Sequence, residues 1–153
     1  MPFERLPEPW TYFVDRCFGT GVVPARLREV VAADGAKVIV HDDEFPQNTK
    51  DVAWLPIVGE RGWVLITKDN ALRKNVLETN AILHSGVAAF AMGSAGHTAE
   101  RNAEGIVTAL RAIERCLRRF RPPFIATVTI TGEVYVGWDE RGRLEKAVHV
   151  RGK

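Results

Sequence analysis

The feature that most constrains the fold is a short apolar run, Trp63-Val64-Leu65-Ile66, set between Gly62 and the polar residues Thr67-Lys68-Asp69. The run is β-prone and has no polar alternation, which is typical of a strand buried on both faces. Strands of this kind belong to parallel sheets that are covered by helices on both sides. The sequence therefore predicts an α/β fold.

Three other segments have a strand pattern, and helical patterns separate them. The strand-like segments are 10–14, 37–41 and 87–92, and the helical ones are 25–33, 51–58, 72–83 and 101–120. Alternation of this kind predicts right-handed crossovers around a parallel sheet. Residues 124–130 and 134–136 alternate around Gly132 and predict a β-hairpin. We expect a three-layer domain with a mostly parallel sheet of about four strands plus this C-terminal hairpin.

Length and composition are those of one ordinary globular domain. The chain has 153 residues, of which 46% are hydrophobic and 26% charged, so it can bury a core of its own. We expect an irregular lead-in over residues 1–9 and a main domain over 10–121. Residues 122–153 then form a strand and hairpin extension packed on the same domain.

Cysteine content and the amino-terminal residues indicate a compartment. Cys17 and Cys116 are the only cysteines, and they form neither a metal motif nor a disulfide framework. No apolar run approaches the roughly 20 residues of a membrane span. Residues 1–10 hold two glutamates and three prolines where a signal peptide needs an apolar core. We therefore expect a cytoplasmic protein with no membrane partner, and its net charge of +2 is compatible with a nucleic-acid partner.

Carboxylates follow the predicted strands at the points where they end. Asp15 follows the first strand, the run 42–44 (Asp-Asp-Glu) the second, and Asp69 the third, while Asp51 opens the helix that leads to the third strand. The carboxyl ends of parallel strands meet at one edge of the sheet, where ligands usually bind. We expect these acids to share one crevice.

Acids that share a crevice repel one another and stay ionised together only beside a cation. Oxygen donors without a Cys or His pair favour Mg²⁺ or Mn²⁺ over zinc. Such an ion acidifies a water and neutralises charge at phosphorus, which is the chemistry of phosphodiester hydrolysis. The competing interpretation is that each acid is a solvated loop residue or, like Asp69, a helix cap.

The ordered motifs resemble the PIN-like domain, and more narrowly the short PIN-like proteins grouped with the VapC toxins of bacterial toxin and antitoxin modules. They are Phe13-Val14-Asp15, Val38-Ile39-Val40-His41-Asp42-Asp43-Glu44-Phe45-Pro46, the helix opened by Asp51, and Ile66-Thr67-Lys68-Asp69. The resemblance covers roughly residues 10 to 130. It implies a Mg²⁺- or Mn²⁺-dependent ribonuclease that cleaves single-stranded or structured RNA and is held inactive by a cognate antitoxin protein.

The resemblance also assigns roles to residues. Asp15, Asp51 and Asp69 match three family acids that hold the metal, and Thr67 matches the hydroxyl of the Thr-x-Asp motif. The family's usual second acid lies on a helical insertion between the first two strands, which this chain is too short to build. Asp43 is our preferred substitute because strand alternation would point it to the same side as His41. Asp42 and Glu44 remain alternatives, and without any of them only three acids hold the metal.

Basic residues could bind the RNA. Lys68 could contact the scissile phosphate, or it could form a salt bridge with the acids. Arg111, Arg115 and Arg118 share a stripe of the helix predicted over 101–120. That stripe is either a solvated face or a surface for the RNA backbone.

Other interpretations stay open. The apolar alternation of residues 129–136 could add to a sheet edge or face a partner strand, and we expect its deletion to weaken binding of a homodimer partner or of the antitoxin. A PIN-like domain could also bind RNA or protein without cleaving. The run 38–44 further resembles the start of a phospho-acceptor receiver domain, with Asp69 as the acceptor. The order fits a receiver poorly, because the acidic pair ends the second strand instead of the first.

Overall fold

The computed structural model describes residues 4–18, 21–68, 76–93 and 96–152. Within them lies one sheet of seven strands in the order β2-β1-β3-β4-β5-β6-β7. The strands are β1 (Thr11–Val14), β2 (Lys37–Val40), β3 (Val64–Lys68), β4 (Ala88–Met92), β5 (Phe124–Val128), β6 (Val134–Asp139) and β7 (Gly142–Val150). The first five pair in parallel, and β6 and β7 are antiparallel to their neighbours. The mostly parallel α/β sheet is confirmed, but the expected number of about four strands is too low.

The carboxyl-terminal strands account for the difference. β5 and β6 form the predicted hairpin around Gly132, whose φ is 88°. β5 also pairs in parallel with β4, and this long-range pairing leaves no signal in the local sequence. β7 pairs with the far side of β6, so residues 134–136 lie inside the sheet. Addition to a sheet edge, one of the two roles expected for 129–136, is thus seen where β6 extends the sheet beyond β5, and β7 instead of β6 is the edge strand on that side.

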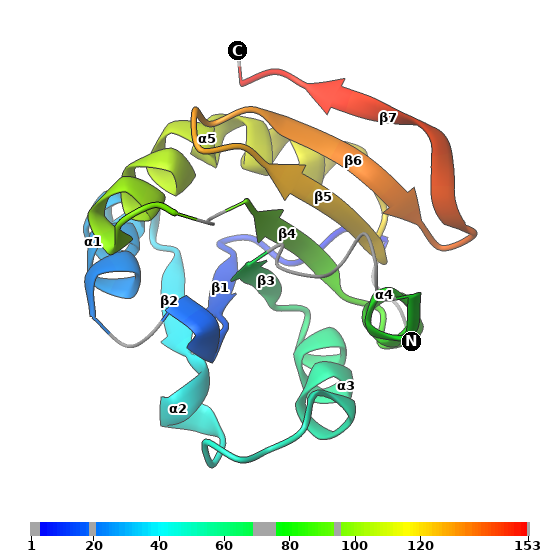
Figure 1. Ribbon diagram of the computed structural model, residues 1–153, viewed down its shortest axis with the longest axis horizontal. Coiled ribbons are helices and arrows are strands. Elements are labelled where there is room, and N and C mark those ends of the chain that lie inside the picture. The colour runs from blue at the N-terminus through cyan, green and yellow to red at the C-terminus, as the bar shows by residue number, and fades with distance from the viewer. Residues whose placement is uncertain (1–3, 19–20, 69–75, 94–95, 153) are drawn as a thin grey trace.

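Four longer helices cover the two faces of the sheet (Figure 1). They are α1 (Val22–Val31), α3 (Asp51–Arg61), α4 (Val76–His84) and α5 (Ala99–Arg119). α1 and α5 lie on one face, where Tyr12 and Val14 join the core, and α3 and α4 lie on the other, where Phe13 does. Successive strand residues thus enter different cores, which explains the continuous apolar runs.

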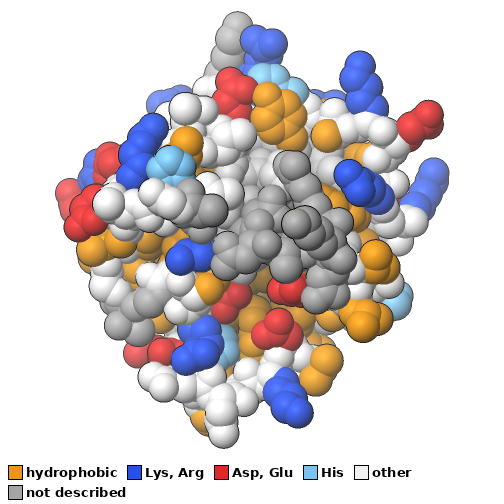
Figure 2. Space-filling view, in the orientation of Figure 1, with side chains coloured by type: hydrophobic (Ala, Val, Ile, Leu, Met, Phe, Trp, Pro, Cys, Tyr) orange, Lys and Arg blue, Asp and Glu red, His pale blue; other side chains and the backbone are white. Residues whose placement is uncertain are grey.

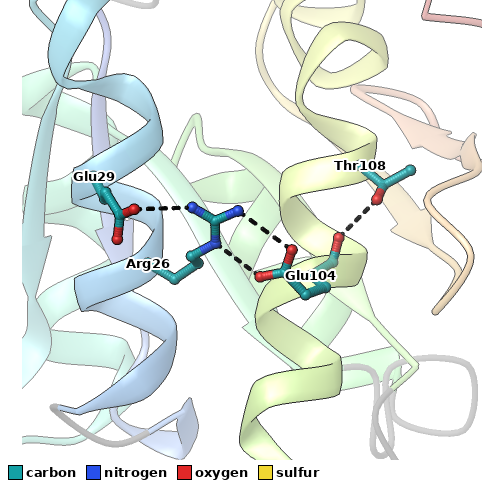
Figure 3. Close-up of polar contacts among 4 residues, drawn as sticks. All are labelled: Arg26, Glu29, Glu104 and Thr108. Carbon is teal, nitrogen blue, oxygen red and sulfur yellow. Dashed lines mark hydrogen bonds and ion pairs between the residues drawn. The ribbon is translucent and has the colours of Figure 1, made fainter.

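A polar cross-link joins α1 to α5 on the outside of their layer (Figure 3). The guanidinium of Arg26 donates two hydrogen bonds to the carboxylate of Glu104, at 2.8 and 3.4 Å, and a third to Glu29 at 3.3 Å. The paired geometry raises the pKa of Arg26 and lowers that of Glu104. Because the groups are solvated, the cross-link orients the helices more than it stabilises them.

Two local predictions need correction. β2 stops at Val40, and residues 41–44 form the short helix α2 (His41–Glu44) instead of prolonging the strand. The helix predicted over 51–58 runs further, to Arg61, and Gly62 with a φ of 69° caps it. Among the described residues, no helix combines the length and apolar character that crossing a bilayer requires.

Candidate active site

Asp15 and Thr67 come together because β1 and β3 are parallel neighbours in register. Val14 lies opposite Ile66, so the next residue of each strand emerges at the same edge. The Thr67 hydroxyl donates a hydrogen bond of 2.7 Å to Oδ2 of Asp15, and the Asp15 amide donates one of 2.9 Å to the Ile66 carbonyl. The Thr67 side chain is buried. This geometry fixes the direction in which the Asp15 carboxylate points.

Asp51 is the first residue of α3, and the same helix orients it. Trp54 lies one turn further on, buried, and donates its indole N–H to Oδ1 of Asp51 at 3.1 Å. Residues three apart on a helix are surface neighbours, which allows this contact. A buried tryptophan therefore positions the carboxylate with one oxygen left for another partner.

Glu78 is the acid that the sequence analysis missed. It lies on α4 within the segment predicted as helical, four residues before the buried Ile82, and both line the same hollow. An acid placed one turn from a core residue on the inward stripe of a helix is unusual. This position on the inward stripe could have identified Glu78 from the sequence, but the sequence analysis considered only acids at strand ends and at the start of the helix after the second strand.

The three acids border a small hollow at the carboxyl edge of the sheet. Its volume is about 10 Å³, close to the room that one water molecule needs. The lining residues are Asp15, Asp51, Trp54, Leu55, Leu65, Thr67, Glu78 and Ile82. In the space-filling view, acidic side chains gather near the middle of the visible face with hydrophobic ones around them (Figure 2).

The carboxylates destabilise one another's charge. Burial raises the pKa of Asp51, and the negative charge of Asp15 raises it further. Burial likewise raises the pKa of Glu78, with Asp51 and Asp15 adding to the effect. A cation in the hollow would stabilise the ionised form of each carboxylate, because its positive charge offsets the burial and the repulsion.

The donor set fits a hard, hydrated cation. Every charged side chain among the described residues that line the hollow is a carboxylate, the ligand that Mg²⁺ and Mn²⁺ prefer. No three acidic, histidine or cysteine side chains of the described residues stand close enough together to hold an ion jointly. Mg²⁺ is usually bound through one or two carboxylates and several waters, so this spacing is compatible with it. The predicted ligand Asp69 lies outside the described residues.

The run at positions 42–44 does not join the hollow. Asp43, our expected second acid, is exposed on α2 and is not among the residues that line it. Asp42 contacts Nδ1 of His41 at 3.1 Å and Nε of Arg16 at 3.5 Å. Glu44 accepts a hydrogen bond from Arg61 at 2.9 Å. The strand-alternation argument for Asp43 fails because these residues form a helical turn.

Lys68, the last residue of β3, points toward an aromatic ring. Its ammonium nitrogen lies 5.4 Å from the centroid of the Phe18 ring, within cation–π range. Among the acids that the structure describes, none forms an ion pair with Lys68. The predicted salt bridge to the acidic cluster is therefore not seen with Asp15, Asp51 or Glu78, and the phosphate contact stays a prediction.

The predicted arginines lie away from the acids. α5 starts near the carboxyl edge after β4 and returns to the start of β5, so its last turns approach the opposite edge. Arg111 and Arg118 line a cavity of about 610 Å³ beside Trp10 and Tyr12, at the amino end of β1. Arg115 lines a separate groove with Arg118. The structure does not bring this set to the hollow.

Cys17 is a further neighbour of the hollow. Its Sγ lies 3.7 Å from the Thr67 hydroxyl oxygen. Burial, followed by the charge of Asp15, raises the pKa of the thiol to about 11. The thiol is therefore protonated at neutral pH in the metal-free protein, and a hard cation such as Mg²⁺ prefers the carboxylate oxygens beside it.

Comparison with known proteins identifies the family to which the chain belongs. Residues 11–94 match the family described as "PIN like domain". The chain is 32% identical over 120 residues to "Putative ribonuclease VapC45" of Mycobacterium tuberculosis, an alignment that covers 76% of this chain and 83% of the relative. No solved structure matches the chain. On the sequence match and the extent of the similarity, this protein belongs to the PIN-like domain family.

Proposed function

We propose that this protein is a ribonuclease that depends on Mg²⁺ or Mn²⁺ and hydrolyses phosphodiester bonds of RNA. The observation that carries the proposal is the convergence of Asp15, Asp51 and Glu78 on one hollow, where burial and mutual repulsion raise the pKa of two of them. Perturbed carboxyl groups at a strand edge mark functional sites. The name of the Mycobacterium tuberculosis relative supports the same activity.

Each side chain has a part in the proposed mechanism. Asp15, Asp51, Glu78 and Asp69 would hold a hydrated metal ion, one or two of them directly and the others through its waters. When bound, the ion supplies an acidified water and charge neutralisation at the phosphorus. Thr67 keeps Asp15 oriented, and Trp54 does the same for Asp51. Glu78 lines the same hollow, so its carboxylate would orient a water of the hydrated ion.

We also propose that the activity is the toxic part of a toxin and antitoxin pair, as the VapC name of the relative suggests. Exposed apolar side chains on α3 and α4, the two helices that border the hollow, support a protein partner that binds this part of the molecule. Val52, next to Asp51, is 73% exposed, and Leu77, next to Glu78, is 81% exposed. Exposed apolar side chains at a polar site are typical of protein interfaces. A cytoplasmic location and a homodimer belong to this proposal.

A cleavage assay separates a nuclease from a non-catalytic PIN-like binding domain. A mixed pool of single-stranded RNA would be incubated with the native chain, Asp15→Asn or Asp69→Asn, with Mn²⁺ or with EDTA. We expect cleavage only by the native chain with Mn²⁺. Equal cleavage by all three proteins would discard the site, and no cleavage by any would favour the binding domain.

The partner proposal has its own test. A candidate antitoxin would be co-expressed with the native chain and with the double variant Val52→Ser, Leu77→Ser, and complexes would be measured by light scattering. We expect the variant to lose the complex while keeping its cleavage of RNA. A complex of unchanged affinity would show that the partner does not bind over Val52 and Leu77.

A further inference from the structure

A second polar surface lies far from the acids, which we call the arginine groove. It has a volume of about 500 Å³ and is lined by Arg115, Arg118, Arg119, His149, Val150 and Arg151. Four of these six residues are arginines and none is an acid. A groove of this composition concentrates positive charge.

The arginine groove lies on the other side of the sheet from the hollow. The hollow is bordered by α3 and α4, whereas the groove is formed by the last turns of α5 and the end of β7. Val150 anchors the β7 side, since it is buried in the core that α1 and α5 cover. At 1.5 Å per residue, Arg115 lies about 24 Å along α5 from its first residue.

Much of this charge is uncompensated. Arg118 forms an ion pair with Glu8 at 3.3 Å, and Nε2 of His149 lies 3.6 Å from the carboxylate of Glu133. Arg119 and Arg151 are exposed and pair with no acid in the part of the chain that the structure describes. The groove is thus open to an anion that presents several negative charges in a row.

An aromatic pair stands at the rim. The rings of Tyr135 and His149 stack with centroids 4.6 Å apart and an interplanar angle of 19°. Arg151 is close enough to Tyr135 to act on it electrostatically. Cationic grooves with neighbouring aromatic rings are typical of nucleic-acid surfaces, because guanidinium groups hold phosphates and rings stack on bases. An acidic peptide would use the arginines alone.

We infer that the arginine groove binds the phosphodiester backbone of RNA at a distance from the hollow. The inference rests on the proposed nuclease function and deepens it, because it selects the substrate class. An RNA that occupies both places must pass from one side of the sheet to the other. The substrate is therefore an RNA large enough to reach both places, whereas a short single strand occupies only one of them.

Binding without cleavage tests the inference. Fluorescence anisotropy in EDTA would measure the affinity of a labelled folded RNA, such as a transfer RNA, and of a six-nucleotide single strand. The test variant is Arg119→Ala, Arg151→Ala. The control, Arg141→Ala, Lys146→Ala, removes two exposed cations at the β6–β7 turn and on β7. Thermal unfolding would establish that both variants are folded.

We expect the test variant to lose about tenfold in affinity for the folded RNA. The slope of log affinity against log salt should become shallower by about 1.4 to 1.8, the value for two lost phosphate contacts. In EDTA the acidic hollow repels phosphates, so the six-nucleotide strand can use only the groove and should also lose affinity in the test variant but not in the control.

The inference would be overturned by an unchanged salt slope, or by an equal loss in the control variant. It would also be overturned if a polyglutamate peptide of equal charge bound the groove as tightly as the RNA. Because the measurement is made in EDTA, it does not depend on catalysis. Failure of the groove is thus distinguishable from failure of the nuclease, which the cleavage assay reports.

Discussion

The Thr67 hydroxyl and Oδ2 of Asp15 are joined by a hydrogen bond of 2.7 Å that links the ends of two neighbouring parallel strands. Thr67 is buried and directs its hydroxyl at the carboxylate from the side. The contact makes Thr67 a positioning residue for the acid at the edge of β1. It also ties the orientation of Asp15 to the register of the sheet.

Replacing Thr67 by Val should lower the cleavage rate while leaving the fold intact. Val keeps the shape of the side chain but removes the donor to Asp15, and a hydrogen bond to a charged group is worth about 1.5 to 3 kcal/mol. We expect a loss of about 10- to 100-fold in kcat/KM with Mn²⁺. Thr67→Ser keeps the hydroxyl and should retain most of the activity. Equal rates for Val and Ser would remove Thr67 from the site.

Glu78 and Asp43 offer a direct choice between the acid that the structure places in the hollow and the one that the sequence favoured. Glu78→Gln should weaken Mn²⁺ binding and slow cleavage by about tenfold or more, the scale of changes around metal sites. Asp43→Asn should change neither, since Asp43 is exposed on α2. Calorimetric titration with Mn²⁺ gives the affinities. The reverse pattern would reinstate Asp43.

The raised pKa values of Asp51 and Glu78 predict a pH dependence of stability in EDTA. The folded protein holds their protons to a higher pH than the unfolded chain, where they titrate near 3.8 and 4.5. Stability should therefore fall as the pH rises from those values through the raised pKa values of the folded state. Above the raised pKa values the two carboxyl groups are ionised in the folded and the unfolded state alike, so their destabilising contribution no longer changes with pH.

The double variant Asp51→Asn, Glu78→Gln isolates that contribution from the other titrating groups. Its free energy of unfolding, relative to the native chain, should increase with pH across the window and then level off. Urea unfolding from about pH 4 to pH 8 measures both proteins. A difference that stays constant with pH would show that the two carboxyl groups are not destabilised by burial and repulsion.

Gly59 sets how closely α3 can approach the end of α4. A Cβ atom at this position would overlap the carbonyl oxygen of Ser85, which belongs to the backbone and cannot rotate away. Alanine normally stabilises a helix interior by roughly 0.5 to 1 kcal/mol relative to glycine. Here the overlap should outweigh that gain, and Gly59→Ala should lower the free energy of unfolding by about 1 to 3 kcal/mol.

Gly137→Ala provides the matched control for Gly59. Nothing lies within 4 Å of a Cβ built at Gly137, on β6. This change should leave the free energy of unfolding within about 0.5 kcal/mol of the native value. Urea unfolding compares the two variants. If both change stability alike, the approach of α3 to α4 is not tight at Gly59.

The apolar runs of the sequence were enough to predict the parallel sheet. Val64, Leu65 and Ile66 are all buried, yet Leu65 faces a different core from its two neighbours. Only a strand covered on both faces requires three apolar residues in succession. Local pattern could not reveal that β5 joins β4 or that β7 exists, because strand pairing depends on residues far apart in the chain.

For the site, the sequence was enough to predict that Asp15 and Thr67 would lie at the same edge of the sheet, because the carboxyl ends of parallel strands share that edge. It also placed Asp51 at the start of the helix that returns to that edge. Only the packing of the folded chain brings Glu78 to the hollow and leaves Asp43 outside it. Helix packing brings α4 beside α3, and a helical turn carries Asp43 to the surface. Neither the packing of α4 against α3 nor the helical turn at 41–44 can be predicted from the local hydrophobic periodicity of the sequence.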